Sequence, residues 1–315
     1  MVSLANRVIA VLTKRLKAKF WTALSLAWLL ASKCLLPADT VLLIPVADTS
    51  LREMEPDPPS ANGSAADLVA GTQGAFAFFA TNRALIQFDP ASSIPASSQI
   101  TEARLTLAVT KSADNTNDTQ NFHLRRVLTP WGEADATWNF RLLPDIAWST
   151  PGGAINTDFS AIVSASQGID GINTNPYTFL STSNLVADVQ IWLDNPAANF
   201  GWVLLAQQEE IPQSARRIAS RENTVSPPPM LEVSYIPPPR IDGFQLANGQ
   251  FSLRFSAEPP YDYVVEFRDS LSSGNWAALT NFTAKVADFE ATASDSLSAS
   301  PQRFYRVTKT PCRCK

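Results

Sequence analysis

Short runs in which apolar and polar residues alternate recur along most of the chain. Residues 104–109 and 230–235 are the clearest examples, with leucine, valine and tyrosine at every second position. A period of two places these side chains on one face of a strand. Polar segments rich in glycine, proline, asparagine and serine separate the runs, as is typical of turns. The pattern predicts an all-β protein.

Two further runs are apolar without alternation, at residues 40–46 and 201–206. The first run fits a strand buried on both faces, between a core and a covering loop, and the second reads as a buried strand. Residues 85–88 also read as a strand. Residues 48–63 are polar and proline-rich, so we expect a loop there. Residues 142–182 contain repeated glycine, asparagine and serine and predict long loops with short strands.

One segment after residue 40 has helical spacing. Leu185, Val186, Val189 and Trp192 recur at intervals of three and four, which predicts a helix over 183–193 with Ser183 as its N-cap. Asn195-Pro196 ends it, because the residue before a proline disfavours helical geometry. Trp192 is expected in the core.

The three prolines 237–239 mark the clearest domain boundary, a stiff extended linker. Beyond it, residues 241–308 alternate in about six short segments and predict a small sandwich of the immunoglobulin or fibronectin type III kind. This unit resembles β-domains appended to secreted bacterial proteins in Tyr263-Val264-Val265-Glu266, in Trp276 and in Phe304-Tyr305-Arg306-Val307. The predicted organisation is residues 1–38, 39–236, the linker 237–240, 241–308 and a tail, 309–315.

Residues 1–38 have the features of a secretory signal peptide. Six basic and no acidic side chains accompany an apolar stretch of 12 residues, 20–31, which is short for a membrane crossing. Leu36-Pro37-Ala38 offers a cleavage site. A lipid anchor on Cys34 and an uncleaved anchor are the alternatives, although Lys33 departs from a lipoprotein signal. We therefore expect a protein that is secreted, or held at the cell surface, with no membrane span after signal removal.

Charge and cysteine content limit the possible partners and the possible covalent cross-links. Without residues 1–38 the chain has 19 basic and 29 acidic side chains, which argues against nucleic acid as a partner, because nucleic-acid binding needs a cationic face. Cys312 and Cys314 lie in the tail, where a bridge between them would be strained and two thiols make an incomplete metal site. The fold is expected to stand without disulfides.

Residues 122–140 concentrate the unusual side chains of the chain. Trp131-Gly132-Glu133 follows a predicted strand, and Thr137-Trp138-Asn139 follows four residues later. Together with five other stretches in the same order, this segment resembles the DNRLRE family of secreted β-sandwich modules. The other stretches are Asp48-Thr49 with residues 68–71, then 83–89, 100–107, 185–193 with 199–201, and 220–222 with 229–233. The resemblance implies a jelly-roll-like β-sandwich over residues 39–236 with a non-catalytic role, carbohydrate binding in some members.

Candidate catalytic groups are few. His123 is the only histidine, and it lies in a predicted strand beside Arg125 and Arg126 without a nucleophile motif, so we interpret it as a solvated side chain. A histidine-based metal site is excluded by that count. Glu133 and Asp135 lie two residues apart and could form a carboxylate pair for glycan cleavage, although carboxylates after such a turn more often accept backbone hydrogen bonds.

Sugar binding is the sharper hypothesis, because indole rings stack on the apolar faces of pyranoses. The candidate ligand-binding residues are Trp131, Trp138, Trp148, Arg125, Arg126 and Arg141. The tryptophans lie in or beside predicted loops, and the arginines could pair with an acidic polysaccharide. For each tryptophan the alternative is burial in the core, and each arginine could equally be solvated.

A structural calcium ion is the one cofactor that the placement of carboxylates along the sequence suggests. If the first strand runs antiparallel to the strand at 230–235, Asp48 and Glu222 fall at the same end of the sandwich, where loop oxygens suit calcium. Salt bridges to Arg52 or Arg221 are the alternative. The sequence thus predicts a secreted, non-catalytic module that binds extracellular polysaccharide. A structural or adhesive surface protein without a sugar site, and more remotely a carboxylate-based glycan-cleaving enzyme, stay open.

Overall fold

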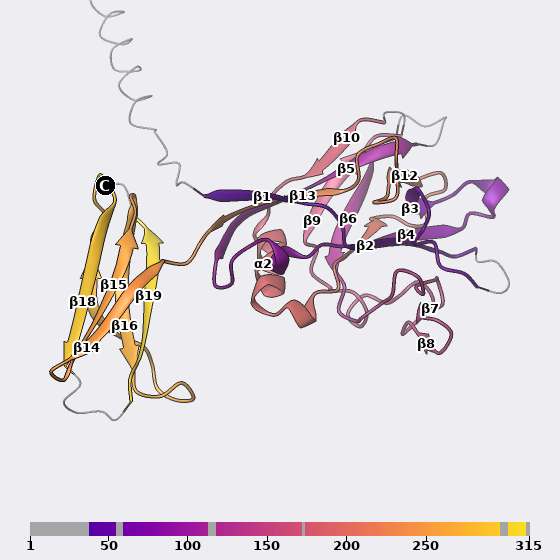
Figure 1. The fold of residues 1–315 in the computed structure, drawn as a ribbon. Helices are drawn as coiled ribbons and strands as arrows, with labels where there is room; N and C mark the ends of the chain where they lie inside the picture. Colours follow the sequence, from indigo (N-terminus) through magenta and orange to yellow (C-terminus); the bar gives the residue numbers. More distant parts are fainter. Residues whose placement is uncertain (1–37, 55–58, 113–117, 172–173, 297–301, 313–315) are drawn as a thin grey trace, which may run out of the picture. The chain divides into compact units, whose positions relative to one another are not determined.

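The computed structural model describes residues 38–54, 59–112, 118–171, 174–296 and 302–312. The predicted signal peptide, Cys34 and Cys314 lie outside these residues. The chain divides after Pro238 into two compact units, a larger one that begins at Ala38 and a smaller one that follows Pro238. Both units are built from antiparallel strands (Figure 1). The prediction of an all-β, sandwich-like protein is therefore confirmed.

The larger unit contains one curled sheet of eleven strands in the order β1-β13-β5-β12-β3-β4-β11-β6-β9, with β10 beside β5 and β2 beside β4. A separate hairpin is formed by β7 and β8. The strands are β1 Asp39–Leu43, β2 Ala47–Arg52, β3 Asp67–Thr72, β4 Thr81–Gln87, β5 Gln99–Lys111, β6 Gln120–Arg126, β7 Phe140–Leu142, β8 Ile146–Ala147, β9 Ala165–Ile169, β10 Pro176–Phe179, β11 Trp202–Ala206, β12 Arg216–Ala219 and β13 Met230–Ile236. Three short 3₁₀ helices lie between them, η1 Ala75–Ala77, η2 Pro90–Ser92 and η3 Pro196–Ala198.

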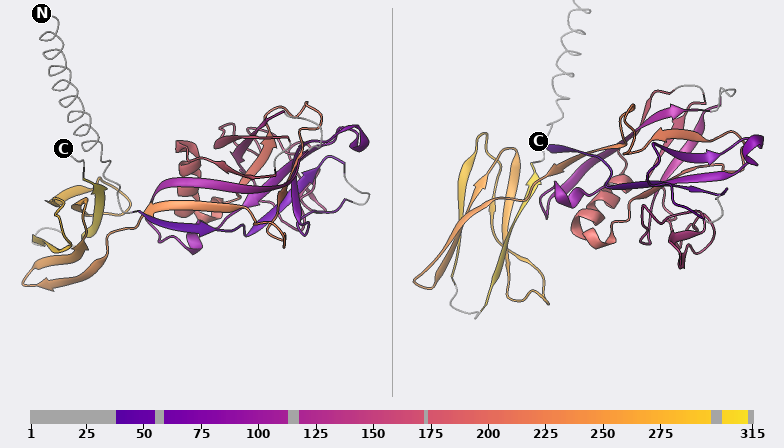
Figure 2. Two further views of the ribbon diagram at one scale, coloured as in Figure 1. Left: turned by 90° about the horizontal axis from the view of Figure 1, so that it is seen from above. Right: turned by 45° about the vertical axis from the view of Figure 1, so that its right-hand side comes forward.

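The curl makes the two ends of the strand order into facing layers, with the main core between them (Figure 2). Leucines of β5 and β13 meet Ile86 of β4 and alternate residues of β11. Helix α2, Ser183–Asp194, adds Leu185, Val189 and Trp192 to this core. The indoles of Trp192 and Trp202 lie 4.4 Å apart between ring centroids. Trp192 is thus a core residue, as its helical spacing predicts.

Strand β11 is buried on both faces because a second core lies behind its layer. Trp202 and Leu204 enter the main core, whereas Val203 and Leu205 enter the second one. The second core is closed by residues 127–164, which we call the covering segment and which fold back over β2, β4 and β11. The unbroken apolar run at 201–206 therefore has a direct physical cause.

Three expectations need correction. Residues 40–46 are not buried on both faces, since Leu42 and Ile44 are exposed. The reason is that only one face of β1, which carries Val41 and Leu43, lies against the main core. Residues 48–63 are not all loop, because β2 pairs with β4. Its polar side chains are buried and in part hydrogen-bonded, as when Ser50 Oγ accepts the Val69 amide. The N-cap of α2 is Thr182, one residue earlier than expected.

The smaller unit contains two three-stranded sheets, β14-β15-β18 and β17-β16-β19. Its strands are β14 Ile241–Ala247, β15 Gln250–Ala257, β16 Tyr261–Arg268, β17 Ala277–Phe282, β18 Phe289–Ser296 and β19 Phe304–Pro311. Leu253 and Phe255 from the first sheet and Tyr263 and Val265 from the second are buried, so the unit is the two-sheet sandwich that the alternation predicts. Strand β19 extends three residues beyond the predicted boundary at 308.

Candidate functional site

Two of the three predicted sugar-binding tryptophans have their indole nitrogens tied to the backbone. Trp148 is 4% exposed, and its Nε1 donates to the Thr137 carbonyl at 2.9 Å. Trp131 is half-buried, and its Nε1 donates to the Phe200 carbonyl at 2.8 Å. Both rings contribute to the second core. This packing assigns them to the attachment of the covering segment.

Trp138 is also half-buried against the second core. The guanidinium carbon of Arg83 lies 5.5 Å from its ring centroid. Arg83 is itself fixed by two hydrogen bonds to Glu209, of 2.7 and 2.6 Å, and by the carbonyls of Gly152 and Gly153. A cation and a glycine turn therefore enclose much of this indole.

The three predicted sugar-binding arginines each bind the protein itself. Arg125 donates to the carbonyls of Ser160 and Ala161, and Arg141 donates to the Pro130 carbonyl at 2.8 Å. Arg126 forms an ion pair of 3.0 Å with Asp188. These contacts hold the covering segment and α2, and they leave the sugar-binding role of the three arginines a prediction.

The structure brings Asp48 and Glu222 together, as the antiparallel pairing of β1 and β13 predicts, and adds Glu133 of the covering segment. One oxygen from each of the three carboxylates lies within 4.8 Å of the others. We call Asp48, Glu133 and Glu222 the acidic cluster. Arg221 joins it, since its side chain pairs with Glu133 and with Glu222 at 2.8 Å and its amide donates to Asp48 Oδ2 at 2.9 Å.

Asp48 is fully buried in this cluster. Burial, together with the charges of Glu222 and Glu133, raises the pKa of Asp48 from 3.8 to about 7, against the lowering effect of the Arg221 amide. Carboxylate ligands could hold a cation here. The alternative of a salt bridge to Arg221 is also realised, whereas Arg52 lines a separate groove.

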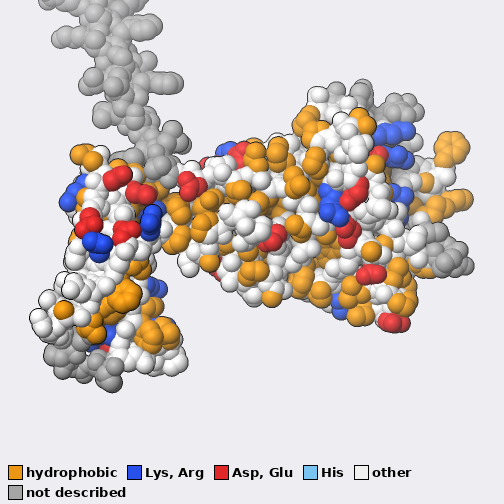
Figure 3. Space-filling model, in the orientation of Figure 1, with side chains coloured by type: hydrophobic (Ala, Val, Ile, Leu, Met, Phe, Trp, Pro, Cys, Tyr) orange, Lys and Arg blue, Asp and Glu red, His pale blue; other side chains and the backbone are white. Residues whose placement is uncertain are grey.

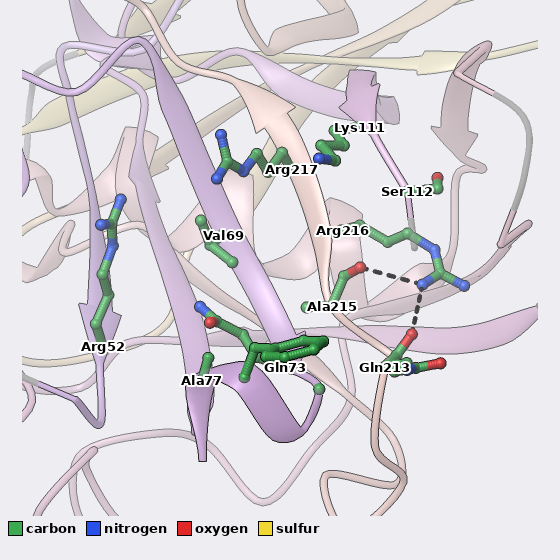
Figure 4. Close-up of a pocket in the computed structure, with 12 residues that line it drawn as sticks. Arg52, Val69, Gln73, Ala77, Lys111, Ser112, Gln213, Ala215, Arg216 and Arg217 are labelled. Carbon is green, nitrogen blue, oxygen red and sulfur yellow. Dashed lines mark hydrogen bonds between the residues drawn. The ribbon is translucent and has the colours of Figure 1, made fainter. Parts of the chain in front are cut away.

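A groove with a cavity volume of about 510 Å³ crosses the outer face of the larger unit (Figure 4). We call it the basic groove, because Arg52, Lys111, Arg216 and Arg217 line it. Strand β12 lies between β3 and β5, so that Arg217 is directly opposite Val69 on one side and Lys111 on the other. Arg52, at the end of β2, lines the same groove.

The positive charges of the basic groove are incompletely balanced. Arg217 lies 3.9 Å from Asp67, whose other oxygen accepts a hydrogen bond from Thr110. Burial and the Arg217 charge lower the pKa of Arg52, and its Nε has no hydrogen-bond partner among the described residues. Arg216 is buried and donates to backbone carbonyls such as that of Ser214 at 2.9 Å. The groove is therefore suited to an anion.

An exposed aromatic loop adjoins the groove. Phe76, Phe78 and Phe79 follow β3 and are 108%, 76% and 51% exposed, and Phe76 lines the groove. Phe78 and Phe79 have φ values of 52° and 59°, which is uncommon for bulky side chains and marks a tight, strained turn. We call these three residues the phenylalanine loop. Figure 3 shows hydrophobic side chains protruding at this end of the unit, near lysine and arginine side chains.

The catalytic candidates have other partners in the structure. Glu133 accepts hydrogen bonds from Arg221 through both carboxylate oxygens and from the Asp48 amide at 2.8 Å. Burial and the Arg125 charge lower the pKa of His123, which favours its neutral form. Both carboxylate oxygens of Glu133 are thus engaged within the protein.

Comparison with known proteins gives no independent assignment: no family model matches the chain, and no curated protein matches it. The resemblance to the DNRLRE family therefore stays a prediction from the quoted motifs. Across the part of the chain that the structure describes, none of the helices has the length and apolarity required to cross a bilayer.

The sequence reasoning missed the basic groove and the phenylalanine loop. The groove cations come from the ends of β2 and β5 and from β12, which are distant in sequence, so no local motif connects them. The loop did carry a signal, because three phenylalanines within four residues follow two glycines. Such a segment has no polar alternation and could have been recognised as an exposed apolar turn.

Proposed function

We propose that this chain is a secreted, non-catalytic module that binds an acidic extracellular polysaccharide in the basic groove. The observation that carries the proposal is the placement of Lys111 directly opposite Arg217, with Arg52 lining the same cavity. Like charges in this position repel each other across the strands. Carboxylate or sulfate groups of a glycan would remove that repulsion and accept charge-assisted hydrogen bonds.

The apolar part of the groove supports a sugar as the ligand. Val69, Phe76 and Ala77 lie among the cations. A sugar ring presents an apolar face to such side chains while its acidic group pairs with a cation. The cavity volume of about 510 Å³ is within the usual range for ligand sites.

Nucleic acid fits the charge distribution less well. After residue 38 the chain carries 29 acidic and 19 basic side chains, and the cations of the groove form a local cluster. Binding to a duplex or single strand requires a broader positive face along the backbone. A short acidic stretch of a polysaccharide requires only a local one.

The test compares two polymers with one backbone. The full chain is titrated with dextran sulfate and with neutral dextran, and Trp fluorescence or calorimetry measures binding; polygalacturonate then separates carboxylate from sulfate preference. We expect binding to the acidic polymers alone, weakening as salt rises. Equal binding of dextran and dextran sulfate would contradict the proposal, and so would unchanged affinity for the acidic polymers in an Arg217→Gln variant.

The phenylalanine loop supports a second candidate function, that of an adhesive or structural surface protein. The exposed phenylalanine loop is the kind of apolar patch that an adhesive or structural surface protein presents to a partner. In that case a Phe76→Ser variant would lose self-association or attachment to a cell surface, and glycan binding would be undetectable in both proteins. A glycan-cleaving enzyme would instead release products that a Glu133→Gln variant does not release.

A further inference from the structure

We propose that the acidic cluster binds one calcium ion, held by carboxylate oxygens of Asp48, Glu133 and Glu222. The three ligands come from different parts of the larger unit. Asp48 belongs to β2, Glu133 to the covering segment, and Glu222 to the turn after β12. This inference is independent of the proposed glycan binding, since it concerns a different set of residues.

The spacing of the cluster matches calcium coordination. One oxygen from each carboxylate lies within 4.8 Å of the others. Calcium binds oxygen ligands at about 2.3–2.6 Å, so two of its ligands are separated by at most about 5 Å. The three oxygens are therefore close enough to share one ion, with small side-chain rotations bringing each of them to coordination distance.

Two buried oxygens in the cluster have no donor. Oδ1 of Asp48 and Oε2 of Glu222 are both inaccessible to solvent and without a hydrogen-bond partner among the described residues. Asp48 as a whole is 0% exposed. A buried carboxylate oxygen without a donor or a cation is strongly unfavourable. These two oxygens supply the lone pairs that a metal ion requires.

The charge of the cluster also fits a divalent cation. Three carboxylates and the Arg221 guanidinium give a net charge of −2 when all are ionised. Arg221 is occupied with both oxygens of Glu133 and with Oε1 of Glu222, so it does not reach the two orphaned oxygens. A calcium ion would neutralise the remaining charge, with water completing the six to eight ligands that it takes.

The close approach of Gly63 fixes the position of Glu133. A Cβ atom at residue 63 would lie 2.4 Å from the Glu133 carbonyl oxygen and 2.5 Å from its Cγ. The Glu133 side chain also accepts the Asp48 amide at 2.8 Å. The third ligand is therefore held against β2 by backbone packing, which reduces the entropic cost of ordering the site.

The experiment uses the full chain after treatment with EDTA. Calorimetric titration with calcium chloride is expected to show one site per chain, and thermal unfolding followed by Trp fluorescence is expected to shift upward by about 5–10 °C at 100-fold saturation. Five of the eight tryptophans lie in the larger unit, so this signal reports mainly on that unit. Magnesium should give a smaller shift, because it demands shorter, octahedral coordination.

Two isosteric variants make the test specific. Asp48→Asn and Glu222→Gln should each abolish the calcium-dependent shift, while each remains folded in EDTA. Glu232→Gln is the matched control, because Glu232 lies on β13 and forms an exposed ion pair with Arg104 of β5. This variant should keep the full calcium-dependent shift. The proposal is overturned if the wild type shows no calcium binding, if magnesium shifts the transition equally, or if both cluster variants retain the shift. If Asp48→Asn does not fold, Glu222→Gln decides alone.

Discussion

Lys111 and Arg217 lie directly opposite each other on β5 and β12, and both side chains are exposed in the basic groove. Two cations in this relationship destabilise the sheet slightly. We therefore expect Lys111→Gln and Arg217→Gln each to leave the free energy of unfolding unchanged or to raise it by about 0.5 kcal/mol. Each should weaken the binding of an acidic polysaccharide by about tenfold or more, as expected for one charge-assisted hydrogen bond.

The control for these variants is Arg104→Gln, which removes an exposed cation that pairs with Glu102 and Glu232 away from the groove. It should leave polysaccharide affinity unchanged. Urea unfolding and calorimetry of the three variants distinguish a binding role from a stabilising role. A loss of stability in Arg217→Gln comparable to its loss of affinity would contradict the assignment.

Substitution of Phe76 should change glycan affinity without changing the free energy of unfolding. Its side chain is 108% exposed, so Phe76→Ala should change the free energy of unfolding by less than about 0.5 kcal/mol. If the ring stacks on a sugar, the same change should reduce glycan affinity several-fold, and Phe76→Tyr should retain it. Equal affinity of the Ala and Tyr variants would exclude stacking at this position.

The ion pair of Arg83 with Glu209 should matter for stability. Both side chains are largely buried, and Arg83 also binds two carbonyls of the turn beside Trp138. Glu209→Gln leaves the guanidinium without its counter-charge, so we expect a loss of about 2 kcal/mol in the free energy of unfolding. Chemical denaturation measures it. Glu102→Gln, in an exposed pair, should cost less than about 0.5 kcal/mol.

Gly201 is required by its backbone conformation and by its surroundings. Its φ is +72°, and a Cβ atom there would lie 2.2 Å from the Ile86 carbonyl oxygen. Gly201→Ala should therefore destabilise the larger unit by more than about 2 kcal/mol, or prevent its folding. Gly249→Ala is the matched comparison, since Gly249 has a φ of +75° but no atom within 4 Å of its Cβ position. It should cost the smaller unit only about 1 kcal/mol.

The smaller unit should lose stability in acid through Asp295. Burial opposes its ionisation, but hydrogen bonds from Arg303 and Tyr305 prevail and lower the pKa of Asp295 below 3.8. Below the unfolded-state value the unfolded chain binds the proton more readily than the folded one, so the free energy of unfolding falls with pH. The contribution is complete above about pH 4 and is lost as the pH falls through the lowered value.

Urea unfolding between pH 2 and 6, followed by hydrogen exchange in β16 and β18, measures this dependence. Asp295→Asn should flatten it, whereas Glu290→Gln, in an exposed pair with Arg254, should not. An unchanged pH profile in Asp295→Asn would assign the acid sensitivity of the unit to other carboxylates.

The residues differ in how far their positions follow from sequence. The alternation at 104–109 and 230–235 and the spacing of Leu185, Val189 and Trp192 give strands and a helix directly, because each pattern reports a buried face. The run at 201–206 gave a buried strand for the same reason, and its burial on both faces emerged only with the second core. The similar run at 40–46 has one exposed face instead of the predicted two buried ones. Whether a second layer covers the outer face of a strand depends on distant segments, and that information is not local.

At the candidate sites, burial of polar side chains was the main feature that could not be predicted from the sequence. Asp48, Thr49 and Ser50 read as loop residues, but pairing of β2 with β4 buries them. Tertiary hydrogen bonds replace the lost water only for Ser50 Oγ and for one oxygen of Asp48. Antiparallel pairing of the first and last strands correctly placed Asp48 near Glu222. Glu133 could not be added from sequence, because the path of the covering segment is fixed by packing of the second core.

The register of β1 on β13 has a mechanical consequence. Asp39 is opposite Tyr235, so the chain enters and leaves the larger unit at neighbouring points of one antiparallel pair. Where residues 1–38 stay attached as an anchor, a force applied through the chain on either side of this unit would separate the two strands from this end, breaking their hydrogen bonds one after another instead of shearing them together. If this protein is a tether under tension, β1 should separate from β13 first, at low force, while the rest of the curled sheet stays intact.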